Sequence, residues 1–335
     1  MTNYYDQWLA YWDEEKKERA EGRTFIHEEE LEWVRTKQDH RSALLCSRLN
    51  GFVTTGDVTL NEIPERWHTG RHSHGEEAIF IVQGSGFSVI DDGRYDWKSG
   101  SCVFVPFGLV HQHFNTGRTT VRYLSVMAMA LERFAGLAKI MQYDEAAETS
   151  LGTLEGVAAQ QPDVHPDYGR IVLHYEDAPQ RTSKDLHRKD QDRKDEFHLT
   201  KPKEMRAAGA PGHRSRFVHY MGLPQNNFKA REMEITNILC DAPGPDMRSG
   251  KHSHMEAVLY ILEGEGYSVI DGEKIPWKKG SLIQVQGPRT VHQHFNTGDV
   301  ESQQLRIHYG IRSQFFQAIA RRVFPYQYYE FSTNR

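Results

Sequence analysis

The chain has 335 residues, of which 38% are hydrophobic and 26% are charged, and its formal net charge is -5. This length suits about two domains, each able to bury a core of its own. The slightly acidic balance gives no electrostatic reason to expect nucleic acid or an anionic membrane as a partner, so we expect a small-molecule substrate.

The amino-terminal region, residues 1–45, is predicted to form two short helices. One of them carries Tyr5, Trp8, Leu9 and Trp12 at helical spacing, and such an aromatic stripe is typical of a docking face onto the body or onto a second subunit. The chain does not open with the basic start and apolar run of a signal peptide, and no later stretch is apolar enough to span a membrane. We therefore expect a cytoplasmic protein.

A long internal repeat organises the rest of the chain. GRHSHGEEAIFIVQGSG begins at Gly70 and GKHSHMEAVLYILEGEG begins at Gly250, and VHQHFNTG ends each unit, starting at Val110 and again at Val291. A repeat offset by about 180 residues indicates a duplicated domain rather than a solenoid. We expect the two units at residues 46–145 and 206–335.

Each unit reads as an all-β domain closed by a helix. Short β-branched and aromatic runs, FIVQG, FSVID and SCVFVP in the first unit and LYILEG, YSVID and SLIQVQ in the second, alternate with turns and predict an antiparallel barrel or sandwich. The predicted closing helices are LERFAGLAKIM, with Leu131, Phe134, Ala138 and Met141 on one face, and SQFFQAIARRVF in the second unit. The region between the units, residues 146–205, contains RTSKDLHRKDQDRKDEFH and is predicted to be a charged, solvated connector.

Paired histidines are the clearest functional signal. Side chains alternate along a strand, so the HSH and HQH motifs each present two imidazoles on one face. Paired imidazoles on two strands, in both units, predict a metal site in at least one of them. The predicted ligands are His72, His74 and His111 in the first unit and His252, His254 and His292 in the second.

At these residues the sequence resembles the cupin superfamily, whose second motif, G(x)5PxG(x)2H(x)3N, is met by Gly100, Pro106, Gly108, His111 and Asn115. The first cupin motif, G(x)5HxH(x)3–4E(x)6G, is met in part around His72 and His74. The resemblance implies a bicupin, with two double-stranded β-helix (jelly-roll) barrels and flanking helices.

Departures from the first motif leave its glutamate ligand open. Counting back from Gly84 selects Glu77, whereas strand alternation from His74 selects Glu76, whose counterpart in the second unit is Glu256. Counting back in the second unit gives Ala257, which has no ligand atom. That unit also has Gln286 where the motif expects proline.

A three-histidine site without a firm carboxylate is similar to that of gentisate 1,2-dioxygenase-like bicupins. This resemblance implies Fe(II), with O2 as co-substrate, and ring cleavage of a hydroxylated aromatic acid. Imidazole sites also accept Mn(II), Ni(II) and Zn(II). A Mn(II) bicupin of the oxalate-decarboxylase type and a non-catalytic metal-binding sensor or storage protein are the alternatives.

Four further residues are candidates for substrate chemistry. His113 and His294 stand two residues beyond a predicted ligand, where they could exchange a proton with a substrate hydroxyl or could instead support a metal ligand or pack in the core. Arg122 and Arg306 lie on the strand after the second motif, where a guanidinium could bind a substrate carboxylate. The aromatic tail FPYQYYEF and the amino-terminal aromatic stripe together predict a homo-oligomer.

Overall fold

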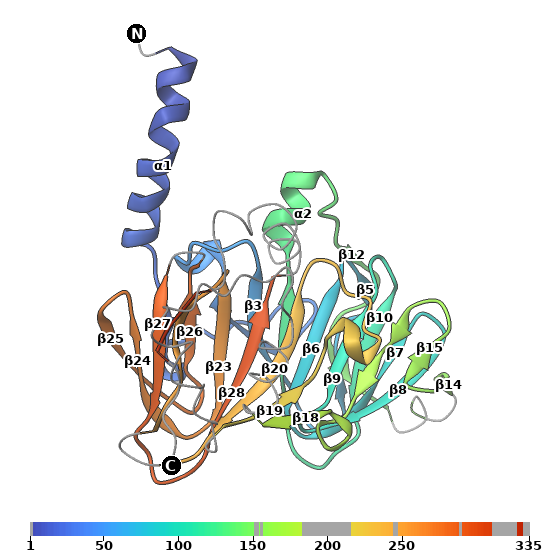
Figure 1. Cartoon of the computed structure of the whole chain (residues 1–335). Coiled ribbons are helices and arrows are strands. Elements are labelled where there is room, and N and C mark those ends of the chain that lie inside the picture. The colour runs from blue at the N-terminus through green and yellow to red at the C-terminus, as the bar shows by residue number, and fades with distance from the viewer. Residues whose placement is uncertain are drawn as a thin grey trace.

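The computed structural model describes residues 3–150, 154, 157–182, 216–243, 247–287, 290–309 and 327–330. Over these residues the chain forms two neighbouring β-barrels, and each barrel consists of two mostly antiparallel sheets (Figure 1). The all-β class expected from the sequence is confirmed. The second predicted closing helix and part of the aromatic tail lie outside the described residues.

Barrel 1 is formed by the first repeat unit. One sheet has the order β17-β9-β6-β11-β3-β2, and the other contains β12-β5-β10-β7-β8-β14, with β4 paired to β10. The strands are β2 Arg41–Cys46, β3 Asp57–Ile63, β4 Trp67–His68, β5 His72–Ser73, β6 Glu77–Gln83, β7 Ser85–Ile90, β8 Gly93–Lys98, β9 Cys102–Val105, β10 His111–Asn115, β11 Val121–Met127, β12 Met141–Gln142, β13 Ala147–Glu148, β14 Ala159–Gln160 and β17 Val172–Leu173.

Barrel 2 repeats this plan with the second unit. Its sheets have the orders β1-β26-β23-β28-β20-β19-β18 and β25-β24-β27-β22-β29, with β21 paired to β27. The strands are β1 Phe25–Ile26, β18 Gln180–Thr182, β19 Arg216–Tyr220, β20 Glu234–Asp241, β21 Met247–Arg248, β22 Lys251–Ser253, β23 Ala257–Glu263, β24 Glu265–Ile270, β25 Glu273–Lys278, β26 Leu282–Val285, β27 Val291–Asn296, β28 Ser302–His308 and β29 Gln327–Glu330. A separate hairpin, β15 Val164–His165 with β16 Gly169–Arg170, precedes β17.

The two barrels exchange the segments that precede them. β1 comes before barrel 1 but pairs with β26 of barrel 2, and β17 comes before barrel 2 but pairs with β9 of barrel 1. Each segment continues with a histidine whose Nδ1 contacts a serine Oγ of the adopted barrel, His27 with Ser281 at 2.9 Å and His174 with Ser101 at 2.8 Å. The exchange therefore ties the barrels together through backbone and side-chain hydrogen bonds.

The largest apolar core lies between the barrels rather than inside either one. It includes Leu60 and Leu124 from barrel 1 and Ile238 and Leu305 from barrel 2, all fully buried. Burial of such a side chain contributes about 1.5–3 kcal/mol, so this shared core stabilises the two barrels as one unit. Smaller clusters fill the interior of each barrel.

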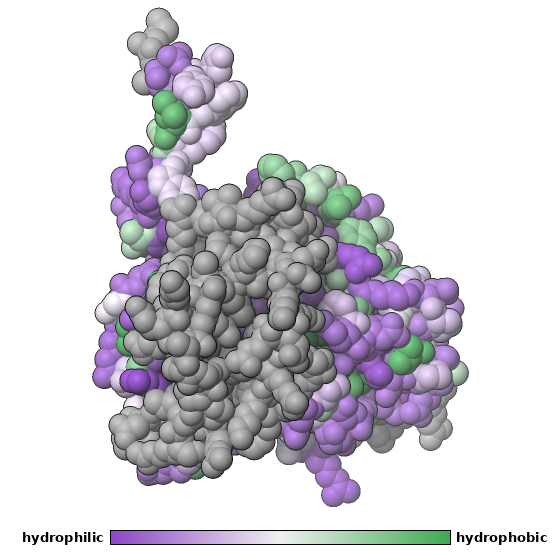
Figure 2. Space-filling model, viewed as in Figure 1, coloured by the Kyte–Doolittle hydropathy of each residue, from purple (hydrophilic) through white to green (hydrophobic). Residues whose placement is uncertain are grey.

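The amino-terminal region contains one helix, α1 (Tyr4–Glu21), so the prediction of a second helix is wrong. Residues 25–30 form β1 and a short 3-10 turn (Glu28–Glu30) because they pair with barrel 2. Helix α1 stands clear of the body in Figures 1 and 2, and the large apolar and aromatic side chains in its first half are exposed, among them Trp8 at 57%. Within the described part of the chain, Tyr5, Trp8 and Leu9 of the stripe are exposed, whereas Trp12 lines the pocket between α1 and barrel 2.

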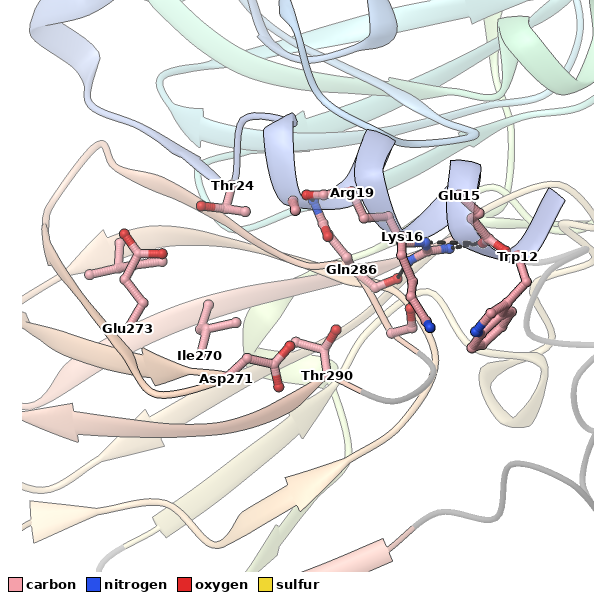
Figure 3. A pocket seen from close by; sticks show the side chains of 13 residues that line it. Trp12, Glu15, Lys16, Arg19, Thr24, Ile270, Asp271, Glu273, Gln286 and Thr290 are labelled. Atoms are coloured by element: carbon pink, nitrogen blue, oxygen red, sulfur yellow. Dashed lines mark hydrogen bonds and ion pairs between the residues drawn. The ribbon is translucent and has the colours of Figure 1, made fainter. Parts of the chain in front are cut away.

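The last turns of α1 are anchored on barrel 2. Arg19 Nη1 donates to the backbone oxygens of Gln286 at 2.7 Å and Gly287 at 2.6 Å, and Gln286 Nε2 donates to the Arg19 oxygen at 3.1 Å. Figure 3 shows the pocket, about 540 Å³, that lies between this part of α1 and barrel 2. Gln286, which departs from the cupin motif, thus has a structural role at the base of the helix.

Helix α2 (Met129–Ala135) is shorter than the predicted closing helix of barrel 1. It ends at Gly136, whose φ of 74° is left-handed, a conformation that glycine adopts without strain and that terminates helices. Met141 belongs to β12 instead, and Phe134 is 91% exposed. The predicted apolar helix face is therefore wrong.

The solvated-connector interpretation is also wrong for residues 169–180, whereas residues 159–162 are exposed. Ile171, Val172 and Leu173 are buried, β17 pairs with β9, and β18 pairs with β19 of barrel 2. Residues 183–215, which hold most of the connector's charges, lie outside the described residues. Among the helices of the described residues, none has the length and apolar character needed to cross a membrane.

Candidate metal centres

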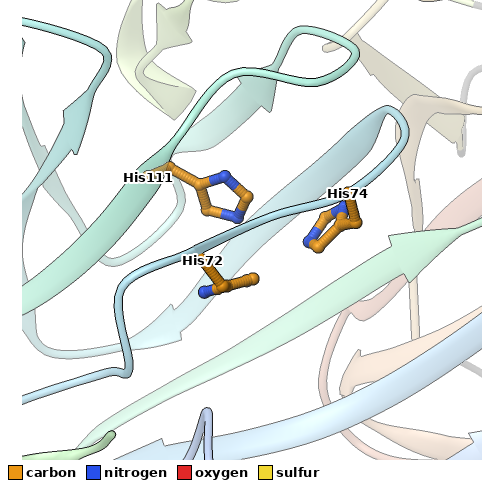
Figure 4. Close-up of side chains that lie close together, drawn as sticks. All are labelled: His72, His74 and His111. Atoms are coloured by element: carbon orange, nitrogen blue, oxygen red, sulfur yellow. The ribbon is translucent and has the colours of Figure 1, made fainter. Parts of the chain in front are cut away.

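Barrel 1 brings together the three histidines predicted as ligands. β5 and β10 are antiparallel neighbours, and His72 lies directly opposite His111, with His74 just beyond the end of β5. Figure 4 shows the three imidazoles converging from these two segments. One nitrogen from each ring lies within 4.8 Å of the others.

The hydrogen bonds of these rings fix which nitrogen faces the centre. Each Nδ1 contacts a backbone carbonyl, Gly70 at 2.8 Å for His72, Gly75 at 3.1 Å for His74 and Leu109 at 3.0 Å for His111. Because a carbonyl only accepts, each Nδ1 carries the proton and each Nε2 presents a lone pair.

Those Nε2 atoms are buried and lack a hydrogen-bond partner among the described residues. Burial, together with the neighbouring imidazoles, lowers the pKa of His72 to about 2. Burial also lowers the pKa of His74, to about 4. Both rings are therefore neutral near pH 7, which is the form that binds a metal ion.

Glu77 completes the set in barrel 1. Its Oε2 lies 3.3 Å from His111 Nε2 and 3.7 Å from His74 Nε2, and its Oε1 accepts a hydrogen bond from the Ser125 hydroxyl. Burial opposes the charge of Glu77, but the contact with His111 and the nearby imidazoles outweigh it and hold the pKa of this carboxyl below its usual range.

Glu76 and Glu256, the other candidates for the carboxylate ligand, are engaged elsewhere. Glu76 Oε2 accepts from the backbone N–H groups of Arg231 at 2.6 Å and Glu232 at 2.9 Å, in the segment before β20. Glu256 Oε1 accepts from Gln284 at 2.7 Å. Strand alternation from His74 wrongly favours Glu76, because the chain turns between β5 and β6 and the alternation does not continue through the turn. Counting back from the closing glycine, Gly84, correctly selects Glu77, which faces the histidines.

The residues of barrel 1 fit a divalent metal ion. Four buried ligand atoms converge, three imidazole nitrogens and one carboxylate oxygen, and each Nδ1 is oriented by a backbone acceptor, as is usual for metal-binding histidines. Facing lone pairs in a buried site repel one another unless a cation or a proton lies between them. This donor set suits Mn(II), Fe(II), Ni(II) or Zn(II) and does not choose among them.

His113 lies beside this centre. Its Nδ1 contacts Ser88 Oγ at 2.7 Å, and Ser88 Oγ also accepts from Trp97 Nε1 at 2.9 Å. His113 Nε2 is buried without a partner in the described part of the chain, and one ring nitrogen lies within 4.8 Å of ligand atoms of Glu77 and His111. Burial lowers the pKa of His113 to about 3, so the ring is neutral.

Barrel 2 repeats the histidine arrangement. His252 lies opposite His292 on antiparallel strands, and ligand nitrogens of His252, His254 and His292 lie within 4.8 Å of one another. The Nδ1 of His252 contacts the Gly250 carbonyl at 2.8 Å, as in barrel 1. His294 Nδ1 contacts Ser268 Oγ at 2.7 Å, and Trp277 donates to that oxygen, which reproduces the setting of His113.

The carboxylate is missing from the corresponding position in barrel 2. Glu77 lies opposite Val105, and Ala257 lies opposite Val285, so the two residues are structurally equivalent. The second centre is therefore a three-histidine set with no glutamate at this place, as counting back from its closing glycine indicates.

The two candidate arginines occupy different surroundings. Arg122 Nη2 donates to Glu28 at 2.6 Å and its Nε lies 3.3 Å from Glu62, so its charge is engaged by residues outside the metal centre. Arg306 is half-buried on β28 and its Nε donates to Thr236 Oγ1 at 3.2 Å. Burial and the neighbouring imidazoles lower the pKa of His254, and the charge of Arg306 adds a smaller effect in the same direction, so the guanidinium lies in the neighbourhood of the second centre.

Sequence reasoning missed three groups in barrel 1. Ser125 holds Glu77, and the Tyr123 hydroxyl donates to Asp39, which is buried and comes from the segment before β2. Burial raises the pKa of Asp39 to about 7. The alternation of β11 could have placed Tyr123 and Ser125 on one face, but no motif in the sequence marks Asp39.

Comparison with known proteins agrees with the duplicated barrel. The model of the cupin domain family matches residues 59–127 and 237–306, one segment in each barrel. An uncharacterized protein of Methanocaldococcus jannaschii is 44% identical over 50 residues, which is 15% of this chain and 39% of the relative. The match covers well under two thirds of that relative's length.

Solved structures share the fold at low sequence identity. A salicylate 1,2-dioxygenase from Pseudoaminobacter salicylatoxidans in adduct with gentisate is 14% identical, covers 79% of this chain and 70% of its own, and has a TM-score of 0.54. A variant of oxalate decarboxylase from Bacillus subtilis is 12% identical, covers 87% of this chain and 78% of its own, and has a TM-score of 0.61. The chain described here is a bicupin, in which each of the two barrels is a cupin domain.

Proposed function

We propose that this bicupin is an oxidoreductase that uses Fe(II) and O2 to open the ring of a hydroxylated aromatic acid such as gentisate or salicylate. The observation that carries the proposal is the convergence of three buried imidazoles on one point in each barrel. The likeness of fold to salicylate 1,2-dioxygenase supports the substrate class, although at 14% identity it shows the fold alone.

When bound, Fe(II) supplies the redox chemistry that joins both atoms of O2 to the ring, and that reaction balances without an external reductant. The protein supplies neutral imidazoles, which leave the positive charge of the ion available to an anionic substrate. It also supplies burial, since the ligands of barrel 1 are at most 3% exposed, and this excludes water from the centre.

His113 and His294 are proposed to exchange a proton with the phenolic hydroxyl of the substrate. Each is held through Nδ1 by a serine that also accepts from a tryptophan, which leaves Nε2 as the nitrogen that can reach the substrate. Burial lowers the pKa of His113, so its imidazole is neutral near pH 7 and offers one donor nitrogen and one acceptor nitrogen.

The proposal is tested by O2 uptake of anaerobically purified, Fe(II)-loaded protein with gentisate, salicylate and other hydroxybenzoates. We expect uptake with loss of aromatic absorbance, and we expect it to disappear when both His72 and His252 are replaced by alanine. Metal-loaded protein that consumes no O2 with any hydroxylated aromatic acid would contradict the proposed reaction.

A Mn(II) decarboxylase is the second candidate, and Glu77 is the observation that favours it. Three histidines and a glutamate in barrel 1 form the donor set that the oxalate-decarboxylase alternative requires in its sites, and the fold is also similar to oxalate decarboxylase. Mn(II)-loaded protein that releases CO2 and formate from oxalate would establish this reading. A protein that binds metal but does neither reaction would instead be a sensor or storage bicupin.

A further inference from the structure

The inner face of β28 differs from its counterpart in barrel 1. Alternate residues along this strand, Gln304, Arg306 and His308, share one face. Gln304 lies opposite Ile261, which belongs to the interior core of barrel 2, whereas the intervening Leu305 belongs to the core between the barrels. The three polar side chains therefore line the inside of barrel 2.

The strand registers identify the equivalent residues of barrel 1. Ser125 lies opposite Ile79 and Arg306 lies opposite Leu259, at the same place in the two sheets. The Glu77 and Ser125 couple of barrel 1 is thus replaced in barrel 2 by Ala257 and Arg306.

This replacement changes the charge around the histidines. Barrel 1 places the carboxylate of Glu77 beside its centre. In barrel 2 the strand register places Arg306 at the position from which Ser125 holds that carboxylate, a difference of two charge units. The nearby carboxyl of Glu234 offsets only part of this charge, because burial raises its pKa to about 7. The second centre is therefore the more positive one and the better suited to an anion.

The polar groups inside the two barrels also differ in how they are satisfied. In barrel 1, Ser125 donates to Glu77 and Tyr123 donates to Asp39. In barrel 2, four buried polar atoms have no hydrogen-bond partner within the described ranges. They are the amide nitrogen and oxygen of Gln304, Nε2 of His308 and Oδ1 of Asn237. Asn237 lies opposite Arg306. Buried polar groups in native proteins are almost always paired, so these groups indicate a polar ligand or ordered water inside barrel 2.

We infer that barrel 2 is the chamber in which this bicupin binds a carboxylate ligand, with the carboxylate held by Arg306 in the place that Glu77 takes in barrel 1. Thr236 orients the guanidinium, and Gln304, His308 and Asn237 offer donors and an acceptor to the rest of the ligand. The inference rests on the proposed function for its substrate, a hydroxylated aromatic acid.

The test measures salicylate binding by calorimetry to full-length, Co(II)-loaded protein in a His72→Ala background, where barrel 2 keeps its histidine set. Replacing Arg306 with glutamine is expected to weaken binding about 10- to 100-fold, the loss typical of a charge-assisted hydrogen-bonded pair. Arg306→Lys, which keeps the charge, is expected to weaken it less, and it serves if the glutamine variant does not fold. Arg41→Gln, which removes a similar charge from the outer surface, is the matched control and leaves binding unchanged.

A second variant introduces the glutamate and serine of barrel 1 at the equivalent positions of barrel 2. Ala257→Glu combined with Arg306→Ser is expected to abolish salicylate binding while Co(II) still binds. Salicylate binding that is unchanged in Arg306→Gln, or that survives in His252→Ala but not in His72→Ala, overturns the assignment. Salicylate that binds as expected without O2 uptake by the Fe(II) form contradicts the proposed reaction and leaves the assignment standing.

Discussion

Replacement of Glu77 by glutamine tests the donor set of barrel 1. The change keeps the shape of the side chain and its ability to accept from Ser125, but it removes the negative charge that lies 3.3 Å from His111 Nε2. Glu77 is fully buried, so no water is at hand to replace that charge. We expect divalent metal to bind barrel 1 more weakly.

The expected size follows from the burial and the distances. Removing one partner of a buried charge pair costs about 3–5 kcal/mol. We take the lower end, about 3 kcal/mol, because the amide of glutamine can still offer an oxygen to the ion. At 1.4 kcal/mol per tenfold change, this corresponds to a loss of about 100-fold in affinity.

The assay is calorimetric titration of Mn(II) or Co(II) into metal-free protein in a His252→Ala background, so that barrel 1 supplies the remaining histidine set. Glu76→Gln is the matched control, because it removes the adjacent carboxylate, which is bound to backbone N–H groups near β20. The reasoning is refuted if Glu77→Gln changes the affinity by less than about fivefold, or if Glu76→Gln weakens it equally.

Four further outcomes are expected. His294→Gln abolishes turnover but leaves metal content unchanged, and joint loss of metal would assign it a structural role. Acidification of metal-free protein from pH 6.5 to 4 lowers the free energy of unfolding, because burial lowers the pKa values of His72 and His74 in the folded state while the imidazoles of the unfolded chain bind protons in this range. Each of the two histidines contributes up to about 1.4 kcal/mol per pH unit. Denaturant melts in which the free energy of unfolding rises as the pH falls would contradict this. Gly86→Ala costs at least about 2 kcal/mol, measured by denaturant melts, since a Cβ would lie 2.0 Å from a backbone oxygen of β10. Arg19→Ala speeds amide exchange throughout α1, and unchanged exchange would show that other contacts hold the helix.

The duplicated fold and the six converging histidines could be predicted from the sequence because both depend on short-range patterns. Strand alternation places His72 and His74 together, and the repeat of identical octapeptides places His111 and His292 in equivalent strands. Residues close together in the sequence are enough to predict these features, so no knowledge of the tertiary structure is needed.

Features that depend on long-range register could not be predicted in the same way. Arg122 and Arg306 look alike as residues of the strand after the second motif, yet the register makes Arg306 equivalent to Ser125 and sets Arg122 against Glu28. Glu77 points toward the histidines and Glu76, which strand alternation favours, does not, because the chain turns before β6.

The exchanged segments carried a weak signal that sequence reasoning did not use. IHEEE at residues 26–30 and LHYED at residues 173–177 occupy equivalent places, but their spacing differs from that of the main repeat, and each pairs with the barrel it does not precede. Only the pairing across the chain shows that the connector after barrel 1 is partly a strand of barrel 1.

The central claim is that both histidine sets bind metal, and the most direct measurement is metal content per chain after anaerobic loading and desalting. The account predicts two divalent ions per chain for the wild type, one for His72→Ala and one for His252→Ala. Wild-type protein that retains no metal, or single variants that retain as much as the wild type, would contradict it.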